Sequence, residues 1–116
     1  MPSRPIVGIS PEAEQDIREA CRWIARDNPK AALQLLHSIS LVIEKIPDFP
    51  GRHSLSPETK LGFTDETVYQ VLHGKSRTKY RVLFTSEKNR ITIIRVLHGA
   101  RKFFGQEFPE DDSDET

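Results

Sequence analysis

Two proline-marked boundaries near the start of the chain limit the fold more than any other feature of the sequence. Ser10 precedes Pro11, and Asn28 precedes Pro29. Serine and asparagine are good helix N-caps, and proline is favoured at the first helical position. Each pair therefore predicts the start of a helix. The second pair also ends the first helix, because a residue before proline disfavours the α conformation.

Both predicted helices are amphipathic. The first has apolar residues at helical spacing: Ala13, Ile17, Ala20, Cys21 and Ile24. Its other face is polar, with Glu12, Asp16, Arg18, Glu19, Arg22 and Arg26. The second helix, which we expect to stop at Pro47, has one apolar stripe of Ala32, Leu35, Leu36, Ile39, Ile43 and Ile46. Two such helices joined by about two residues predict an antiparallel hairpin with one buried face.

Strands are predicted on both sides of this hairpin. Residues 4–9 form a short strand before it, and three strands follow it at residues 68–73, 80–85 and 90–97. The last of these is apolar on both faces, which is typical of a central, covered strand. Residues 47–66 contain three prolines and two glycines, and we expect a loop there with at most a turn of helix. The order β-αα-βββ predicts an α+β fold with the helical hairpin packed on a C-terminal antiparallel sheet.

Length and charge divide the chain into one domain and a tail. The 116 residues suffice for one domain, which we assign to residues 1–106. This part holds all 17 basic residues but only 11 acidic ones, whereas residues 107–116 hold six acidic residues and no basic one. We expect this acidic tail to be disordered. Residues 75–102 are the most basic part, with nine basic residues and one acidic residue, Glu87. Such a segment attracts phosphates or acidic peptides.

Several classes of protein are excluded by what the sequence lacks. No apolar run approaches the ~20 residues of a membrane span, and we find no secretion signal, so we expect a cytoplasmic protein. The single cysteine, Cys21, fits a reducing compartment. No cysteine and histidine pair has metal-ligand spacing, and no glycine-rich loop leads from a strand into a helix. We therefore expect neither a metal site nor a cofactor.

The hairpin between residues 80–85 and 90–97 decides which basic side chains share a face. A turn centred on Glu87 and Lys88 would place Arg81 opposite Ile94, because paired residues lie on one face. That register gathers three basic side chains beside His98: Arg77, Lys79 and Arg81. An odd-length turn or a bulge would bring Arg95 to that face instead. In both registers, several cationic groups lie near one histidine.

Such a group of residues suits a phosphodiester. RNA is cleaved when its own 2′-OH attacks phosphorus, so the protein has to position the backbone, stabilise negative charge and move protons. Arginine matches phosphate oxygens with its planar fork, and histidine moves protons near neutral pH. We assign substrate binding to four basic residues: Lys75, Arg77, Lys79 and Arg95. The alternative is plain phosphate or carboxylate binding without a reaction.

Two segments of this hairpin resemble the RelE/ParE superfamily of toxins. They are Lys79-Tyr80-Arg81-Val82-Leu83-Phe84 and Ile93-Ile94-Arg95-Val96-Leu97-His98-Gly99-Ala100-Arg101. The resemblance covers about residues 4–104 and includes the preceding helical hairpin. It implies a type II toxin of the plasmid-stabilisation kind, silenced by an antitoxin whose acidic segment binds the basic sheet. Superfamily members that resemble RelE cut mRNA on the ribosome, and those that resemble ParE poison DNA gyrase.

The resemblance also implies site residues. Arg81 and Arg101 match the two arginines of RelE-like toxins, and we expect His98 or His73 to move protons beside them. Two lysines of RelE correspond here to Gln70 and Leu72, and its C-terminal tyrosine has no counterpart near Phe103, Phe104 or Phe108. The main hypothesis is a metal-independent, ribosome-dependent mRNA endonuclease. The alternatives are a gyrase inhibitor without nuclease activity and a related protein without toxicity.

Overall fold

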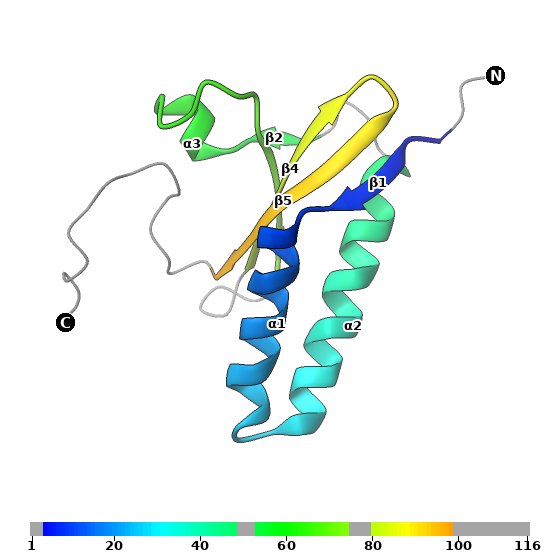
Figure 1. Ribbon diagram of the computed structural model, residues 1–116, viewed down its shortest axis with the longest axis vertical. Coiled ribbons are helices and arrows are strands. Elements are labelled where there is room, and N and C mark those ends of the chain that lie inside the picture. Colours follow the sequence, from blue (N-terminus) through cyan, green and yellow to red (C-terminus); the bar gives the residue numbers. More distant parts are fainter. Residues whose placement is uncertain (1–3, 49–52, 75–79, 99–116) are drawn as a thin grey trace.

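The computed structural model describes residues 4–48, 53–74 and 80–98, which form a strand, a helical hairpin and then a sheet (Figure 1). The elements are β1 (Ile6–Ile9), α1 (Pro11–Ala25), α2 (Pro29–Lys45), the 3-10 turn η1 (Ile46–Asp48), β2 (Ser54–Leu55), α3 (Pro57–Lys60), β3 (Tyr69–His73), β4 (Tyr80–Glu87) and β5 (Arg90–His98). The predicted α+β order is confirmed. Two short elements, β2 and α3, lie where the sequence predicts a loop. The proposed tail falls outside the described residues.

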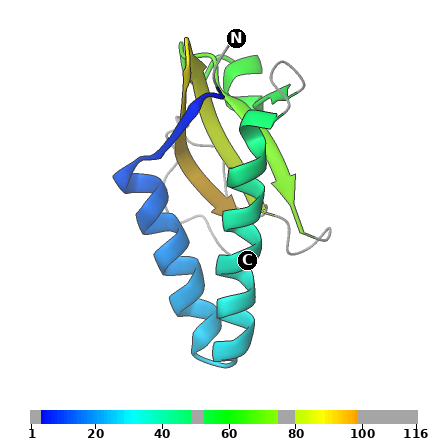
Figure 2. The ribbon, with the colours of Figure 1, turned by 90° about the vertical axis from the view of Figure 1, so that its right-hand side faces the viewer.

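Each helix begins with the same device, a capping side chain followed by proline. The Ser10 hydroxyl accepts a hydrogen bond of 3.1 Å from the Ala13 N–H, and the Asn28 amide oxygen accepts one of 3.1 Å from Ala31. The predicted starts of α1 and α2 are thus confirmed. These helices lie side by side and antiparallel, and their turn lies beyond the end of the strands (Figures 1 and 2). Of the described helices, none combines the length and apolarity needed to cross a membrane.

The strands form one sheet in the order β1-β5-β4-β3-β2. β1 runs parallel to β5, and the other neighbours are antiparallel. β5 therefore lies inside the sheet, as its apolar character on both faces predicts.

The register of the β4–β5 hairpin differs from the one centred on Glu87 and Lys88. Glu87 is paired with Arg90, so the turn residues are Lys88 and Asn89. Lys88 has a φ of 56°, the left-handed conformation that tight hairpin turns require. The register centred on Glu87 and Lys88, one of the two that the sequence left open, is therefore not formed.

A bulge in β5 shifts the pairing again. Phe84 is paired with Ile93 and Leu83 with Arg95, which leaves Ile94 as the extra residue. Arg81 consequently lies opposite Leu97 rather than Ile94, and its neighbour Tyr80 lies opposite His98. Because successive residues point to opposite faces, Arg81 and His98 are on different faces of the sheet.

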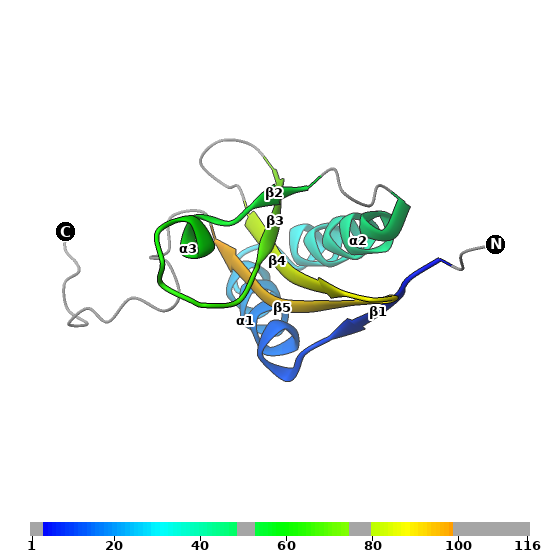
Figure 3. The same cartoon turned by 90° about the horizontal axis from the view of Figure 1, so that it is seen from above.

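Hydrophobic residues fill both faces. The larger cluster lies between the helices and the sheet: Ala13, Ile39, Ile43, Ile46, Val82, Phe84, Ile91, Ile93 and Val96. The smaller one lies on the other face and consists of Val68, Leu83 and Leu97, with Ile94 packed against it. Figure 3 shows α2 and α3 on opposite sides of β3, which matches the two clusters. The sheet is therefore the middle layer of the molecule.

Ser10, the cap of α1, and Asp16 within α1 supply hydrogen bonds to the outer edge of β5 where β1 ends. The Ser10 N–H donates to the Ile93 carbonyl (2.9 Å), and its hydroxyl donates to the Ile94 carbonyl (3.1 Å). Further along, the Asp16 carboxylate accepts the Val96 N–H (2.9 Å). Asp16 was expected on the polar, exposed face of the first helix, but it is buried at 9% exposure because it takes the place of a neighbouring strand.

Candidate functional site

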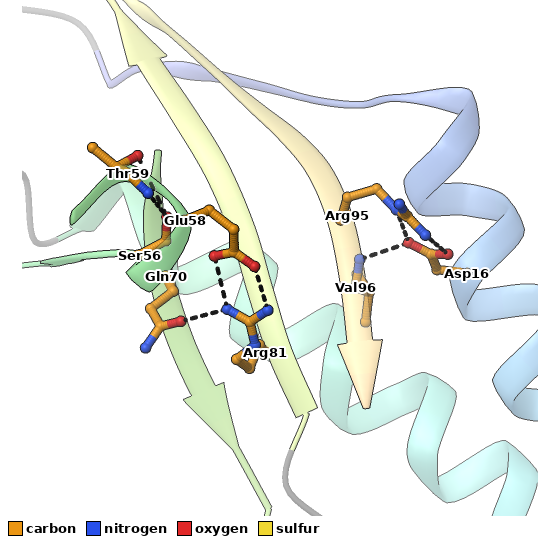
Figure 4. Close-up of polar contacts among 8 residues, drawn as sticks. All are labelled: Asp16, Ser56, Glu58, Thr59, Gln70, Arg81, Arg95 and Val96. Atoms are coloured by element: carbon orange, nitrogen blue, oxygen red, sulfur yellow. Dashed lines mark hydrogen bonds and ion pairs between the residues drawn. The ribbon is translucent and has the colours of Figure 1, made fainter. Parts of the chain in front are cut away.

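Arg81 lies on the face of the sheet that α3 covers, and its charge is neutralised there. Its two terminal nitrogens donate to the two carboxylate oxygens of Glu58, at 3.1 and 2.6 Å, and one of them also donates to the Gln70 side chain at 3.0 Å (Figure 4). The side chains of Arg81 and Glu58 are 8% and 0% exposed. This is a buried, forked ion pair, the strongest geometry available to arginine and carboxylate.

Arg95 forms a second forked pair, with Asp16 of α1. Its Nε and one Nη donate to the two carboxylate oxygens at 2.7 and 2.8 Å (Figure 4). The hydrogen bond to Asp16 raises the pKa of Arg95 above its ordinary value; burial opposes this rise, and the charges of Asp16, Glu12 and Glu19 add to it. Arg95 is therefore a fixed cation that attaches α1 to the bulge of β5.

A row of three polar rings lies at one end of the sheet, on the face that α2 covers. His73 is paired with Tyr80, and Tyr80 with His98. The Tyr80 and His98 rings meet edge to face, with centroids 5.2 Å apart. His73 Nε2 lies 3.0 Å from the Ser38 hydroxyl, which itself donates to the Leu35 carbonyl at 3.0 Å. Since that hydroxyl has one hydrogen, it accepts from His73 Nε2–H, and a neutral His73 then carries its lone pair on Nδ1.

Two acidic groups in this region, the Tyr80 phenol and the Cys21 thiol, are protonated at neutral pH. Burial raises the pKa of the Tyr80 phenol above its ordinary value of 10.0, and the charge of Cys21 adds to the rise. Burial also raises the pKa of the Cys21 thiol above 9.0. Neither group is an anionic nucleophile near pH 7. The chemistry of the row is therefore that of two imidazoles and a neutral phenol.

A largely apolar groove of about 450 Å³ lies between α1 and α2, next to the end of β1. Its lining residues are Ile9, Glu14, Ile17, Arg18, Cys21, Leu36, Ser40 and Ile43. Ile9 and Leu36 are 41% and 42% exposed, so the groove presents apolar side chains to solvent. An apolar concavity with a few polar groups is typical of a binding site.

Residues 7–103 match the family described as ParE toxin of the type II toxin–antitoxin system, parDE. The chain belongs to the ParE toxin family. A solved structure of the chromosomal ParDE TA system from P. aeruginosa superposes with a TM-score of 0.63 at 14% identity, over 82% of this chain and 96% of that one. This likeness extends to the fold alone, and no curated protein matches the sequence. The resemblance to the RelE/ParE superfamily is thus confirmed, and the protein is a toxin of a type II system.

The structure of this ParE toxin places two of the predicted catalytic residues on one face of the sheet and a third on the opposite face. His73 and His98 flank Tyr80, whereas Arg81 points to the opposite face and Arg95 to α1. Of the two registers that the sequence left open, the one that puts Arg81 beside His98 is not formed. The bulge instead pairs Arg95 with Leu83, on the same face as Arg81. The remaining predicted residues lie outside the described part: Lys75, Arg77, Lys79 and Arg101. The catalytic and substrate-binding roles stay predictions.

Sequence reasoning missed Glu58, the partner of Arg81. A local signal was present, because Ser56-Pro57-Glu58 repeats the tripeptide Ser10-Pro11-Glu12 that begins α1. The Ser56 hydroxyl accepts the Thr59 N–H at 3.3 Å, as Ser10 does for Ala13. The strongly basic composition of residues 75–102 was a second signal, since a buried arginine there requires an acidic partner from another segment.

Proposed function

We propose that this ParE toxin arrests growth by binding DNA gyrase and does not cut RNA. The supporting observation is the state of Arg81, the residue that the resemblance assigns to the phosphate of mRNA. Its guanidinium already holds Glu58 with both terminal nitrogens and is buried beneath α3. Gln70 and Leu72, which lie beside Arg81 on β3, are uncharged where RelE has lysines.

The free energies involved favour the state in which Arg81 stays paired with Glu58. Separating one partner from a buried ion pair costs about 3–5 kcal/mol. A preorganised donor contributes roughly 3–4 kcal/mol to stabilising a charged transition state. The two terms cancel, so Arg81 gives little net help to RNA cleavage while Glu58 remains bound to it. A toxin of this design acts more readily by surface recognition than by phosphate chemistry.

An endonuclease remains the second candidate because of the histidine row. The two imidazoles lie on β3 and β5, on either side of Tyr80 of β4, and the hydrogen bond to Ser38 assigns the His73 tautomer. A pair of histidines can supply the acid and the base of a metal-independent reaction. In this reading Lys75, Arg77, Lys79 and Arg101, which follow the row in sequence, would hold the phosphate in place of Arg81.

The partner in the resting state is an antitoxin in both readings. Antitoxins of this class are acidic and amphipathic, and the toxin offers a matching surface of two kinds. The groove between α1 and α2 suits the apolar side chains of such a segment. Residues 75–102 contain nine basic residues and one acidic residue, and those that Glu58 and Asp16 do not already hold suit the carboxylates of the antitoxin.

Brief expression of the toxin in growing cells separates the two functions. We expect gyrase-dependent supercoiling to fall and DNA damage signalling to rise before protein synthesis declines. A matched variant, His73→Asn with His98→Asn, should remain toxic, because gyrase binding does not require the imidazoles. Immediate loss of translation with cleaved mRNA, abolished by the same variant, would overturn the proposal in favour of the endonuclease.

A further inference from the structure

The ion pair between Glu58 and Arg81 has the geometry of a bound phosphate. Two parallel N–H groups of arginine meet two oxygens of the carboxylate, at 3.1 and 2.6 Å. The same fork matches two oxygens of a phosphodiester. Gln70 takes a further hydrogen of the guanidinium at 3.0 Å and thereby helps to fix its plane.

The carboxylate comes from outside the basic part of the chain. Residues 75–102 have Glu87 as their single acid, and Glu87 lies at the far end of the hairpin, where its backbone is opposite that of Arg90. Glu58 instead belongs to α3, 23 residues before Arg81. Residues 56–68, the segment between β2 and β3, thus place one acid beside Arg81. Among the described residues, Arg81 is the only arginine with less than 9% exposure.

α3 is held on the sheet by polar contacts. The buried residues of α3 and its cap are Glu58 and Ser56, both polar, and the apolar cluster beneath consists of Val68, Leu83 and Leu97. The neck of the segment 56–68 is closed by the Ser56 N–H on the Val68 carbonyl (2.8 Å) and by Thr59, whose hydroxyl accepts the Val68 N–H (2.9 Å). Since no apolar side chain of α3 is buried, the ion pair of Glu58 with Arg81 is the contact that attaches α3 to β4.

We infer that α3 is an autoinhibitory plug: Glu58 occupies a phosphodiester-binding site built from Arg81 and Gln70 and keeps nucleic acid away from this face of the sheet. The ligand of the site is the backbone of a nucleic acid, recognised by charge and fork geometry. This goes beyond the proposed function, because gyrase inhibition would stand whether or not the site exists.

Variants of the full-length toxin test the plug. Glu58→Ala removes the carboxylate, and Glu66→Ala is the matched control, since Glu66 is an exposed acid of the same segment whose loss changes the net charge equally. We measure the affinity of each for a labelled single-stranded RNA and for a DNA duplex by fluorescence anisotropy at low salt. One added charge-assisted contact corresponds to a gain of about tenfold or more.

Glu58→Ala should bind nucleic acid about tenfold tighter than both the wild type and Glu66→Ala, and adding Arg81→Gln should abolish the gain. A gain for RNA alone identifies single strands as the ligand, and an equal gain for duplex DNA identifies the backbone in general. If Glu58→Ala is unfolded in chloride buffer, inorganic phosphate should restore its folded circular dichroism spectrum. Glu58→Gln, which keeps the side-chain shape, then supplies the binding measurement. Affinities no higher than that of Glu66→Ala in both variants, or a gain that survives Arg81→Gln, would overturn the inference.

Discussion

Arg81 and Arg95 lie on adjacent strands of one hairpin and form the same forked contact with different consequences. Arg81 holds a carboxylate from α3, a helix of four residues, and Arg95 holds one from α1, a helix of 15 residues. The Arg81 side chain is 8% exposed, and that of Arg95 is 29% exposed. Asp16, the partner of Arg95, also accepts the Val96 N–H, whereas Glu58 shares Arg81 with Gln70.

The difference shows that one interaction type serves two purposes in this molecule. The pair of Arg95 and Asp16 belongs to the scaffold, since it attaches α1 to β5 where the edge of the sheet would otherwise lack a partner. The pair of Arg81 and Glu58 neutralises a charge that is buried under a small cover. If Glu58 is lost, Arg81 loses the carboxylate that neutralises it at 8% exposure, whereas Arg95, at 29% exposure, keeps access to solvent. The two pairs should therefore respond differently to mutation.

The largest effect should come from breaking the buried pair on one side only. Glu58→Ala removes the carboxylate that holds both terminal nitrogens of the buried Arg81, so we expect the free energy of unfolding to fall by about 3–5 kcal/mol in urea denaturation. Replacing both members, by Glu58→Leu with Arg81→Met, should restore most of this loss because no buried charge remains. Glu66→Ala serves as the exposed control and should change stability by less than about 0.5 kcal/mol. A loss for Glu58→Ala as small as that of the control would show that Arg81 does not need its partner.

The second largest effect should come from Asp16. Asp16→Ala removes two charged hydrogen bonds to Arg95 and leaves the Val96 N–H without its acceptor. We expect a loss of about 2–3 kcal/mol, which is smaller than for Glu58→Ala because Arg95 can turn to water. Asp27→Ala, at an exposed position between the helices, is the control. A larger loss of stability for Asp16→Ala than for Glu58→Ala in the same assay would contradict this order.

The helical hairpin and the three long strands were predictable because each is long enough to show a repeating pattern of apolar residues. Capping residues before proline fixed the starts of α1 and α2, and apolar spacing fixed their buried faces. β2 was missed, since a strand of two residues contains no period. α3 is the single turn of helix that the sequence allows in the loop, but a helix of four residues contains no period that would locate it. The hairpin register was hidden for a different reason. Ile93 and Ile94 are adjacent and both apolar, so no alternation of polarity reveals that Ile94 is the extra residue of the bulge.

The candidate site was predictable only in part, because it depends on contacts between distant segments. The basic sheet and the motif around Arg81 are local features and were visible in the sequence. The acids that hold Arg81 and Arg95 lie 23 and 79 residues away along the chain. Asp16 was assigned to an exposed face by helical spacing alone, and its burial follows from the early end of β1, which no helical pattern reports.

A smaller effect should distinguish the two serine caps that begin α1 and α3. Ser10→Ala and Ser56→Ala each remove a side-chain acceptor from a helix N-terminus, and each should cost about 1 kcal/mol. The caps differ in what they support. Double-mutant cycles between Glu58 and Arg81 should give a weaker coupling in the Ser56→Ala background, where α3 is loosened, and an unchanged coupling in the Ser10→Ala background. Equal couplings in both backgrounds would indicate that α3 does not position Glu58.

The smallest effect concerns alkaline pH and separates the arginine pairs from Tyr80 and Cys21. Folding raises the pKa of Cys21 above 9.0 and that of Tyr80 above 10.0, both by burial, so the unfolded chain loses these protons first as the pH rises. The free energy of unfolding should therefore be constant up to about pH 9 and decline above it. Arg95 has a raised pKa and stays charged throughout this window, so its pair contributes nothing to the slope. Denaturation between about pH 8 and 11 should show a flatter profile for Cys21→Ala with Tyr80→Phe, and an unaltered slope for Asp16→Asn. A slope that disappears in Asp16→Asn instead would mean that the pair with Arg95 titrates, and that it is less firmly held than its geometry indicates.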